Sequence, residues 1–114
     1  AKGACLKYYL RMMGLARRAN EVILGIDRIE AALKKNFQGS IFLAKDIGAS
    51  SRKKILKLVE HSDKIHLREL PDSKEELGAA QGLNSCVAIA IKIGTLEQTI
   101  RDAVDKAALV EEGG

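Results

Sequence analysis

The sequence is poor in the residues that build disulfide-rich or metal-centred folds. It has one proline, no tryptophan, two cysteines, two tyrosines and two phenylalanines in 114 residues. Cys5 and Cys86 lie far apart, and they form neither a CxxC pair nor any zinc-ligand spacing. Disulfide and metal chemistry therefore have no support in the sequence, and we expect a reducing, cytoplasmic setting.

Long apolar runs are also missing. No run approaches the roughly 20 residues that span a bilayer, and the N-terminus lacks the apolar core of a signal peptide. We therefore expect a soluble, unexported protein without a membrane partner. With 46% apolar residues, the chain can bury one continuous core, so residues 1–114 are predicted to form a single domain with a loose tail at about 111–114.

Enzyme signatures are absent as well. The chain contains no GxGxxG, GxxxxGK[ST], HExxH or GxSxG motif. His61 falls at the end of a predicted helix and His66 on the outward side of a predicted strand, while Cys86 begins a strand in which a thiol is usually a small buried hydrophobe. No nucleophile and base can be paired from local spacing, so we assign no catalytic residue and no cofactor.

Charge is what the sequence does have, and it is unevenly distributed. The net charge is +4, but residues 1–57 hold 13 basic against 4 acidic residues, whereas residues 58–114 hold 6 against 11. A basic half of this kind makes nucleic acid the first partner to consider, although basic residues that merely solvate helix faces explain it equally well. Because Tyr8 is the only ring expected to be exposed, structured RNA bound through phosphates and shape is favoured over base stacking.

Apolar spacing alternates between helical and strand-like periods along the chain. Helix starts are predicted at the glycine of "VILGIDRIEAALKK", at Ser50 or Ser51, at Ser73 with Glu76 and at Thr95. Strands covered by helices predict a three-layer α/β/α sandwich with a small, roughly four-stranded mixed sheet. The expected strands cover residues 21–25, 40–46, 64–70 and 86–93, and the expected helices residues 5–18, 25–35, 50–59, 73–81 and 95–107.

The glycine of "VILGIDRIEAALKK", Gly25, sits where a strand turns into a helix. Backbone N–H groups at such a helix start point outward and can bind an anion, but the glycine can equally serve only as a tight corner. Arg28 follows on the polar side of the same helix.

Two stretches together resemble a known family. "LARRANEVILGIDRIEAALKK" at residues 15–35 and "ELGAAQGLNSCVAIAI" at residues 76–91 are similar to the kink-turn-binding ribosomal proteins of the large-subunit seven-Ae and thirty-e type, and especially to their bacterial YlxQ-like relatives. "IFLAKD" lies between them as the intervening strand. The resemblance implies an α/β/α sandwich and a non-enzymatic protein that binds structured, often kink-turn RNA in ribosome or ribonucleoprotein assembly.

The resemblance also implies where RNA is contacted. In the family, contacts come from the turn that starts the second helix and from the loop before the last strand. Arg17, Arg18 and Lys45 either line the same groove or are ordinary solvated surface. The RNA-binding positions carried over to this chain are Gly25, Ile26, Asp27 and Arg28 on one side and Leu83, Asn84 and Ser85 on the other.

The first of these segments departs from the family pattern. Kink-turn binders typically carry threonine, asparagine and glutamate after the glycine, with a lysine one turn later. This chain has Ile26, Asp27, Arg28 and Ala31 instead, so one amide donor is lost and one charge is reversed. Two rival functions stay open: a protein-interaction module that docks through the acidic C-terminal half, and an enzyme that acts on a nucleotide or RNA.

Overall fold

The computed structural model describes residues 7–113, with side chains described for residues 7–109. Over this range helices and strands alternate as predicted. α5 continues through residues 111–113, for which the sequence predicted a loose tail. Residues 5 and 6 of the first predicted helix, and Gly114, lie outside the described range. The elements are α1 (Tyr8–Arg18), β1 (Val22–Leu24), α2 (Ile26–Lys34), β2 (Gly39–Leu43), α3 (Ala49–Val59), β3 (Ile65–Glu69), α4 (Lys74–Ala80), β4 (Ala88–Lys92) and α5 (Thr95–Gly113).

The four strands form one mixed sheet in the order β1-β4-β2-β3. β4 pairs antiparallel with both β1 and β2, and β2 pairs parallel with β3. β4 carries a short, continuous apolar run, and it occupies the central position that such a run favours, with residues 88–91 buried. Because β1 and β2 run in the same direction, their C-terminal ends both lie beside the start of β4.

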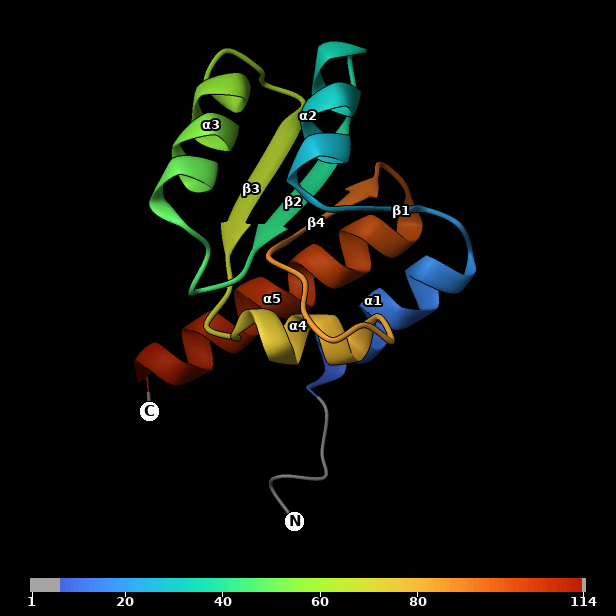
Figure 1. Cartoon of the computed structure of the whole chain (residues 1–114). Helices are drawn as coiled ribbons and strands as arrows, with labels where there is room; N and C mark the ends of the chain where they lie inside the picture. The colour runs from blue at the N-terminus through green and yellow to red at the C-terminus, as the bar shows by residue number, and fades with distance from the viewer. Residues whose placement is uncertain (1–6, 114) are drawn as a thin grey trace.

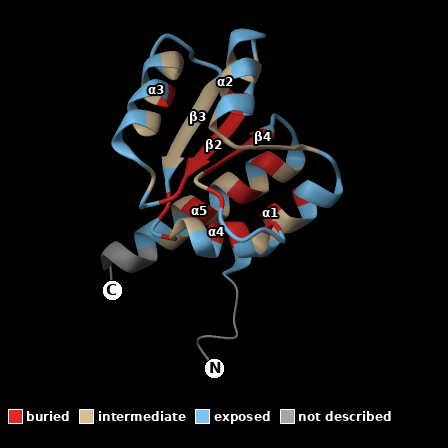
Figure 2. Cartoon of the chain, in the orientation of Figure 1, coloured by how far each residue is buried: buried red, intermediate tan, exposed pale blue. Residues whose placement is uncertain are grey.

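Helices cover both faces of this sheet, which confirms the predicted three-layer sandwich. α2 and α3 lie on one face, and α1, α4 and α5 lie on the other (Figure 1). Each face has its own buried cluster, and the most deeply buried residues line β2, β4 and the inner sides of the helices (Figure 2). Ile29, Ile41 and Ile55 belong to the cluster beneath α2 and α3, whereas Tyr9 and Phe42 belong to the other cluster.

Three helices end in the same backbone motif. Two residues after the helix end, the chain adopts a positive φ, at Asn20 (63°), Asn36 (67°) and Gly82 (73°). In α4 the N–H of Leu83 then donates to the carbonyl of Gly78 at 2.8 Å, as in a Schellman motif. Asparagine and glycine are the residues that tolerate this conformation, so the sequence specifies where these helices stop.

The start of α4 follows the predicted capping box. The N–H of Glu76 donates to Ser73 Oγ at 3.1 Å, and the N–H of Ser73 donates to Glu76 Oε1 at 2.8 Å. The hydrogen bond from the Ser73 backbone is the main reason that the pKa of the Glu76 carboxyl lies below its ordinary value. Local chemistry therefore fixes the first turn of α4.

Two other predicted helix caps are wrong. α3 has Gly48 at its N-cap, so Ser50 and Ser51 lie inside its first turn. α5 begins at Thr95, but Thr95 does not cap it. The N–H of Gln98 donates to the carbonyl of Gly94 at 3.0 Å, so Gly94 takes the cap position. In both cases glycine takes the cap position, and its carbonyl accepts the first helical hydrogen bond, from Arg52 N–H in α3 and from Gln98 N–H in α5.

A buried carboxylate joins the sheet to α5. Glu97 is 2% exposed; Ser40 of β2 donates a hydrogen bond to it, and Arg101 Nε lies 2.8 Å from Glu97 Oε2. Burial alone raises the pKa of Glu97, but the hydrogen bonds from Arg101 and Ser40 outweigh burial, so the pKa lies below its ordinary value. The carboxylate therefore stays ionised inside the protein because two donors reach it.

Candidate nucleic-acid interface

α2 begins directly after a glycine corner. Gly25 has φ 92° and ψ 150°, a conformation that residues with side chains rarely adopt. The N–H of Ile29 donates to the Gly25 carbonyl at 3.0 Å, which closes the first helical hydrogen bond. Within residues 7–113, the N–H groups of Ile26, Asp27 and Arg28 have no hydrogen-bond acceptor. The start of α2 therefore presents free donors at the positive end of the helix dipole.

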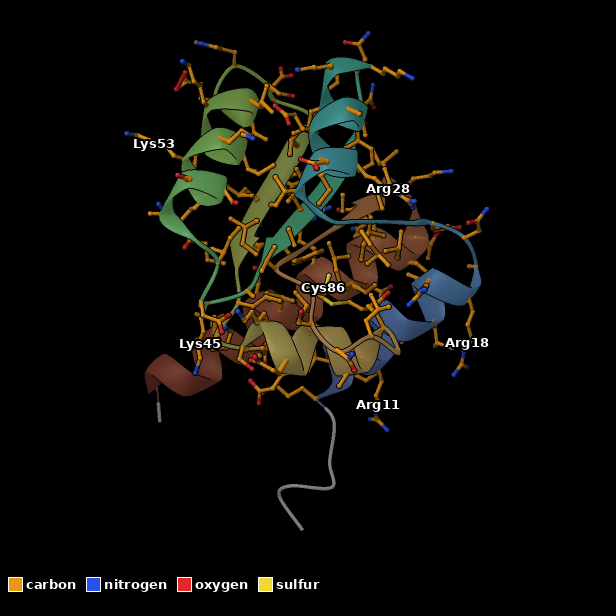
Figure 3. The ribbon with its side chains drawn as sticks, viewed as in Figure 1. Arg11, Arg18, Arg28, Lys45, Lys53 and Cys86 are labelled. Atoms are coloured by element: carbon orange, nitrogen blue, oxygen red, sulfur yellow. The ribbon has the colours of Figure 1, made fainter. Side chains whose placement is uncertain are left out.

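The side chains at this corner divide between core and solvent. Ile26 packs on the cluster beneath α2 and α3, which anchors the first turn. Asp27, Arg28 and Ala31 are all exposed. Arg28 projects outward from α2 (Figure 3), and it has no ion-pair partner among the residues that the structure describes. Its guanidinium is therefore available for a phosphate or a guanine edge.

The second predicted segment is the loop between α4 and β4. A Cβ added at Gly78 would lie 2.6 Å from the Cα and 2.8 Å from the N of Ser85, so α4 and the loop touch backbone to backbone. The N–H of Cys86 donates back to a carbonyl of α4 at 2.9 Å. Leu83, at 38% exposed, and its neighbours Asn84 and Ser85 face solvent. α4 therefore supports this exposed loop through close backbone contact and one backbone hydrogen bond.

Cys86 ends this loop as a structural residue. It is 7% exposed, and its thiol donates to the carbonyl of Ala88 at 3.2 Å. Burial raises the pKa of the thiol. The prediction of a small buried hydrophobe at this position is confirmed.

The two segments border the same end of the sheet. The N–H of Gly25 donates to the carbonyl of Ala88 at 3.3 Å, which places the start of α2 against the start of β4. Ile26 and Val87 pack on one cluster, and the N–H of Ala44 donates to the carbonyl of Val87 at 2.9 Å. Gly25 and Ala88, far apart in the chain, thus become neighbours through the pairing of β1 with β4.

The three remaining predicted cations are not all in one place. The Arg17 guanidinium donates to the carbonyl of Gln81, and Arg17 and Arg18 line a pocket between α1 and the end of α4. The N–H of Lys45 instead donates to the carbonyl of Asp72 at 2.9 Å, beside the start of α4. Figure 3 shows Lys45 well separated from Arg18 and Arg28. The arginines therefore adjoin the Leu83–Ser85 loop, and Lys45 lies at the other end of α4.

The basic side of α3 is partly neutralised. Arg52 donates to Glu69 with an Nε to Oε1 distance of 3.0 Å, and this hydrogen bond lowers the pKa of the Glu69 carboxyl. Lys54 Nζ lies 3.9 Å from Glu30 Oε1. Lys53 points away from the molecule on the side opposite Arg28 (Figure 3). This distribution agrees with a solvated face rather than with part of the α2 site.

On the outer side of α1 the predicted exposure of Tyr8 is confirmed, whereas the exposure of Leu15 was not predicted. Tyr8 is 54% exposed and Leu15 is 45% exposed, although Tyr9, Leu10 and Met13 of the same helix are buried. The seven-residue spacing of Tyr8 and Leu15 is the signal that would have placed both on one outer line. They border a groove between α1 and α4.

Two further features of the described residues bear on function. Within residues 7–113, no three histidine, cysteine, aspartate or glutamate side chains gather as a metal site requires. None of the helices in that range combines the length and the apolar character needed to cross a bilayer.

A four-stranded mixed sheet between helical layers defines a small α/β/α domain. A helix start with free N–H donors and an exposed loop lie at one end of its sheet. The model of the ribosomal protein L7Ae/L30e/S12e/Gadd45 family matches residues 9–100. The chain belongs to this family.

Solved structures show the same fold. A protein with unknown function from Bacillus halodurans C is 24% identical, with a TM-score of 0.78 over 87% of this chain and 98% of that chain. The 15.5kD RNA binding protein of Giardia lamblia is 16% identical, with a TM-score of 0.64 over 85% of this chain and 82% of that one. No curated protein matches the chain.

Proposed function

We propose that this chain is a non-enzymatic RNA-binding protein, a bacterial YlxQ-like member of its family, that acts as one domain in ribosome or ribonucleoprotein assembly. Its target is a structured, kink-turn-like RNA. The observation that carries the proposal is the start of α2 in a chain of the L7Ae/L30e/S12e/Gadd45 family. Its free N–H donors, and Arg28 without an ion pair among the described residues, border the same end of the sheet as the loop before β4.

Each part of this edge suits a different component of folded RNA. The N–H groups of Ile26, Asp27 and Arg28 suit phosphate oxygens, as helix starts generally do. The exposed Leu83 offers an apolar surface to a base that leaves the stack, and Asn84 supplies both a donor and an acceptor to a base edge. The RNA-binding protein of Giardia lamblia, which shares the fold, supports the same class of ligand.

Docking of a protein through the acidic C-terminal half is less well supported. Lys7 Nζ lies 2.9 Å from Asp72 Oδ1, and Arg68 Nε lies 2.8 Å from Asp105 Oδ1. Glu97 is likewise engaged by Arg101, as is Glu69 by Arg52. Because these carboxylates already have basic partners within the chain, the acidic half offers less free negative charge than its composition suggests.

The test is a binding titration with two RNAs. One is a kink-turn RNA, and in the other the sheared G·A pairs are replaced by Watson–Crick pairs. We expect tighter binding of the kink-turn. Equal affinity for both reduces the function to general recognition of structured RNA, and equal affinity for an unstructured oligonucleotide contradicts the proposal.

Salt dependence measures the phosphate contribution in the same titration. With about five phosphate contacts, log affinity against log salt should slope by roughly −3.5 to −4.5. Arg28→Glu should weaken binding and reduce the magnitude of the slope by about 0.7 to 0.9. Lys53→Glu makes the same charge change on the exposed side of α3 and serves as the matched control. A slope near zero, or equal losses in both variants, would refute the assignment of this edge.

A further inference from the structure

The outer side of α1 and the adjacent side of α4 form a groove that leads to the proposed RNA site. Tyr8, Arg11, Leu15 and Arg18 follow one another at spacings of three or four residues, so they lie along one line of the helix. This line is about 15 Å long at 1.5 Å per residue. Gly14, Arg18 and Ala80 line both this groove and the pocket that ends at Gly82, and the two are therefore continuous. The α1–α4 groove is lined by Tyr8, Arg11, Met12, Gly14, Leu15, Arg18 and Ala80.

The charge of the groove is of one sign. Its lining contains no acidic residue, and α1 itself has none. Within the described residues, Arg11 and Arg18 have neither an ion pair nor a side-chain hydrogen bond. Both arginines point outward from α1 (Figure 3). The neighbouring groove between α1 and α5 differs, because Asp102 lies in its lining beside Lys106.

The groove also carries exposed apolar surface. Tyr8 is 54% exposed at its far end, and Leu15 is 45% exposed near its middle. An exposed aromatic ring beside unpaired arginines is the arrangement that stacks an unpaired base while the arginines hold phosphates. At its other end the groove reaches Gly82, directly before the Leu83–Ser85 loop.

We propose that the α1–α4 groove binds a single-stranded RNA segment that flanks the structured element, with Tyr8 stacking on a base and Arg11 and Arg18 contacting phosphates. This inference rests on the proposed function, because continuity with the Leu83–Ser85 loop favours RNA over an acidic helix. The chain then binds a longer RNA footprint than the kink-turn alone, and α1 recognises the strand that leaves it.

The experiment compares a blunt kink-turn RNA with the same RNA carrying a single-stranded extension of about six nucleotides, placed on the 5′ end or on the 3′ end. One of the two extensions should tighten binding at least about fivefold, the least that stacking of one base provides. Tyr8→Ala and Arg11→Ala should each diminish this gain and leave the affinity for the blunt RNA unchanged. Tyr8→Phe should keep the gain because the ring remains.

Lys53→Ala on α3 is the matched control and should bind both RNAs like the unaltered chain. Binding of the blunt RNA reports the proposed function, whereas the difference between blunt and extended RNA reports the groove. Equal affinity for blunt and extended RNA, or a gain that survives Tyr8→Ala, overturns the inference even where the blunt RNA binds tightly. Tyr8-dependent capture of an acidic helical peptide, without any gain from the extensions, would reassign the groove to a protein and also overturn it.

Discussion

The contact between α4 and the loop before β4 leads to a sharp prediction for Gly78→Ala. The new Cβ would meet the Ser85 backbone at 2.6 to 2.8 Å, whereas ordinary contacts begin at 3.4 Å. The loop must therefore move away from α4 by the better part of an ångström. Backbone atoms of Ser85, rather than a flexible side chain, have to give way.

Two opposing terms set the size of the effect on stability. Crowding of a packed site costs about 1–3 kcal/mol. Alanine is favoured over glycine in a helix interior by about 0.8–1 kcal/mol, which offsets part of that cost. We therefore expect Gly78→Ala to lower the free energy of unfolding by up to about 2 kcal/mol, and to weaken RNA binding because the Leu83–Ser85 loop is displaced.

The assay is urea unfolding followed by circular dichroism, together with the kink-turn titration. Ala79→Gly is the matched control. Ala79 is exposed on the same helix, so its replacement measures the difference between alanine and glycine in the helix without any clash. It should destabilise α4 and leave the loop in place. If Gly78→Ala instead raises the free energy of unfolding by about 0.8–1 kcal/mol, the full preference for alanine over glycine in a helix, and binds RNA normally, the close contact does not hold the loop and the reasoning fails.

Two further predictions concern the α2 start and the buried carboxylate. The triple variant Asp27→Asn, Arg28→Glu, Ala31→Lys restores the family pattern on exposed positions, so it should increase the preference for kink-turn RNA over its Watson–Crick-paired version; an unchanged ratio in a competition titration would show that these residues do not set specificity. Arg101→Met should destabilise the fold by about 1.5–3 kcal/mol at pH 7, the value of a hydrogen bond to a charged group, as measured by urea unfolding. Glu97 has a lowered pKa in the folded chain, so its contribution to stability is present above its unfolded pKa and is lost as pH falls through the folded pKa. Without the guanidinium, burial dominates and raises the pKa of Glu97, so the deficit of Arg101→Met should shrink between pH 7 and pH 4; a constant deficit would contradict the proposed coupling.

Local signals in the sequence were enough to predict the elements and the layers. Apolar spacing identified the helices and strands, and the Ser73–Glu76 capping box formed as expected. The predicted helix caps were wrong at Gly48 and Gly94, where glycine takes the cap position and the predicted hydroxyl residues lie within the first turn. Capping preference is a local term that backbone placement can override.

In the candidate site, too, local sequence pattern predicts some features, whereas others depend on how distant elements pack together. The glycine corner at Gly25 and the exposure of Arg28 follow from local pattern. The separation of Lys45 from Arg18 does not, because it depends on how α4 is placed across the end of the sheet. Helical spacing shows that Leu15 shares a side of α1 with Tyr8, but which side of α1 stays exposed depends on how α1 packs against α4 and α5.

The central position of β4, the last strand of the described chain, means that the sheet cannot be completed until β4 has been synthesised. In the sheet, β1 has β4 as its hydrogen-bonded neighbour, and Val22 pairs with Ile91 across most of the chain. Pairing over such a sequence separation forms late and slowly. The basic N-terminal half therefore emerges from the ribosome before its strand partner exists. Because the same pairing brings the start of α2 to the start of β4, a partly synthesised chain carries the positive charge without the assembled edge that we propose as the RNA site.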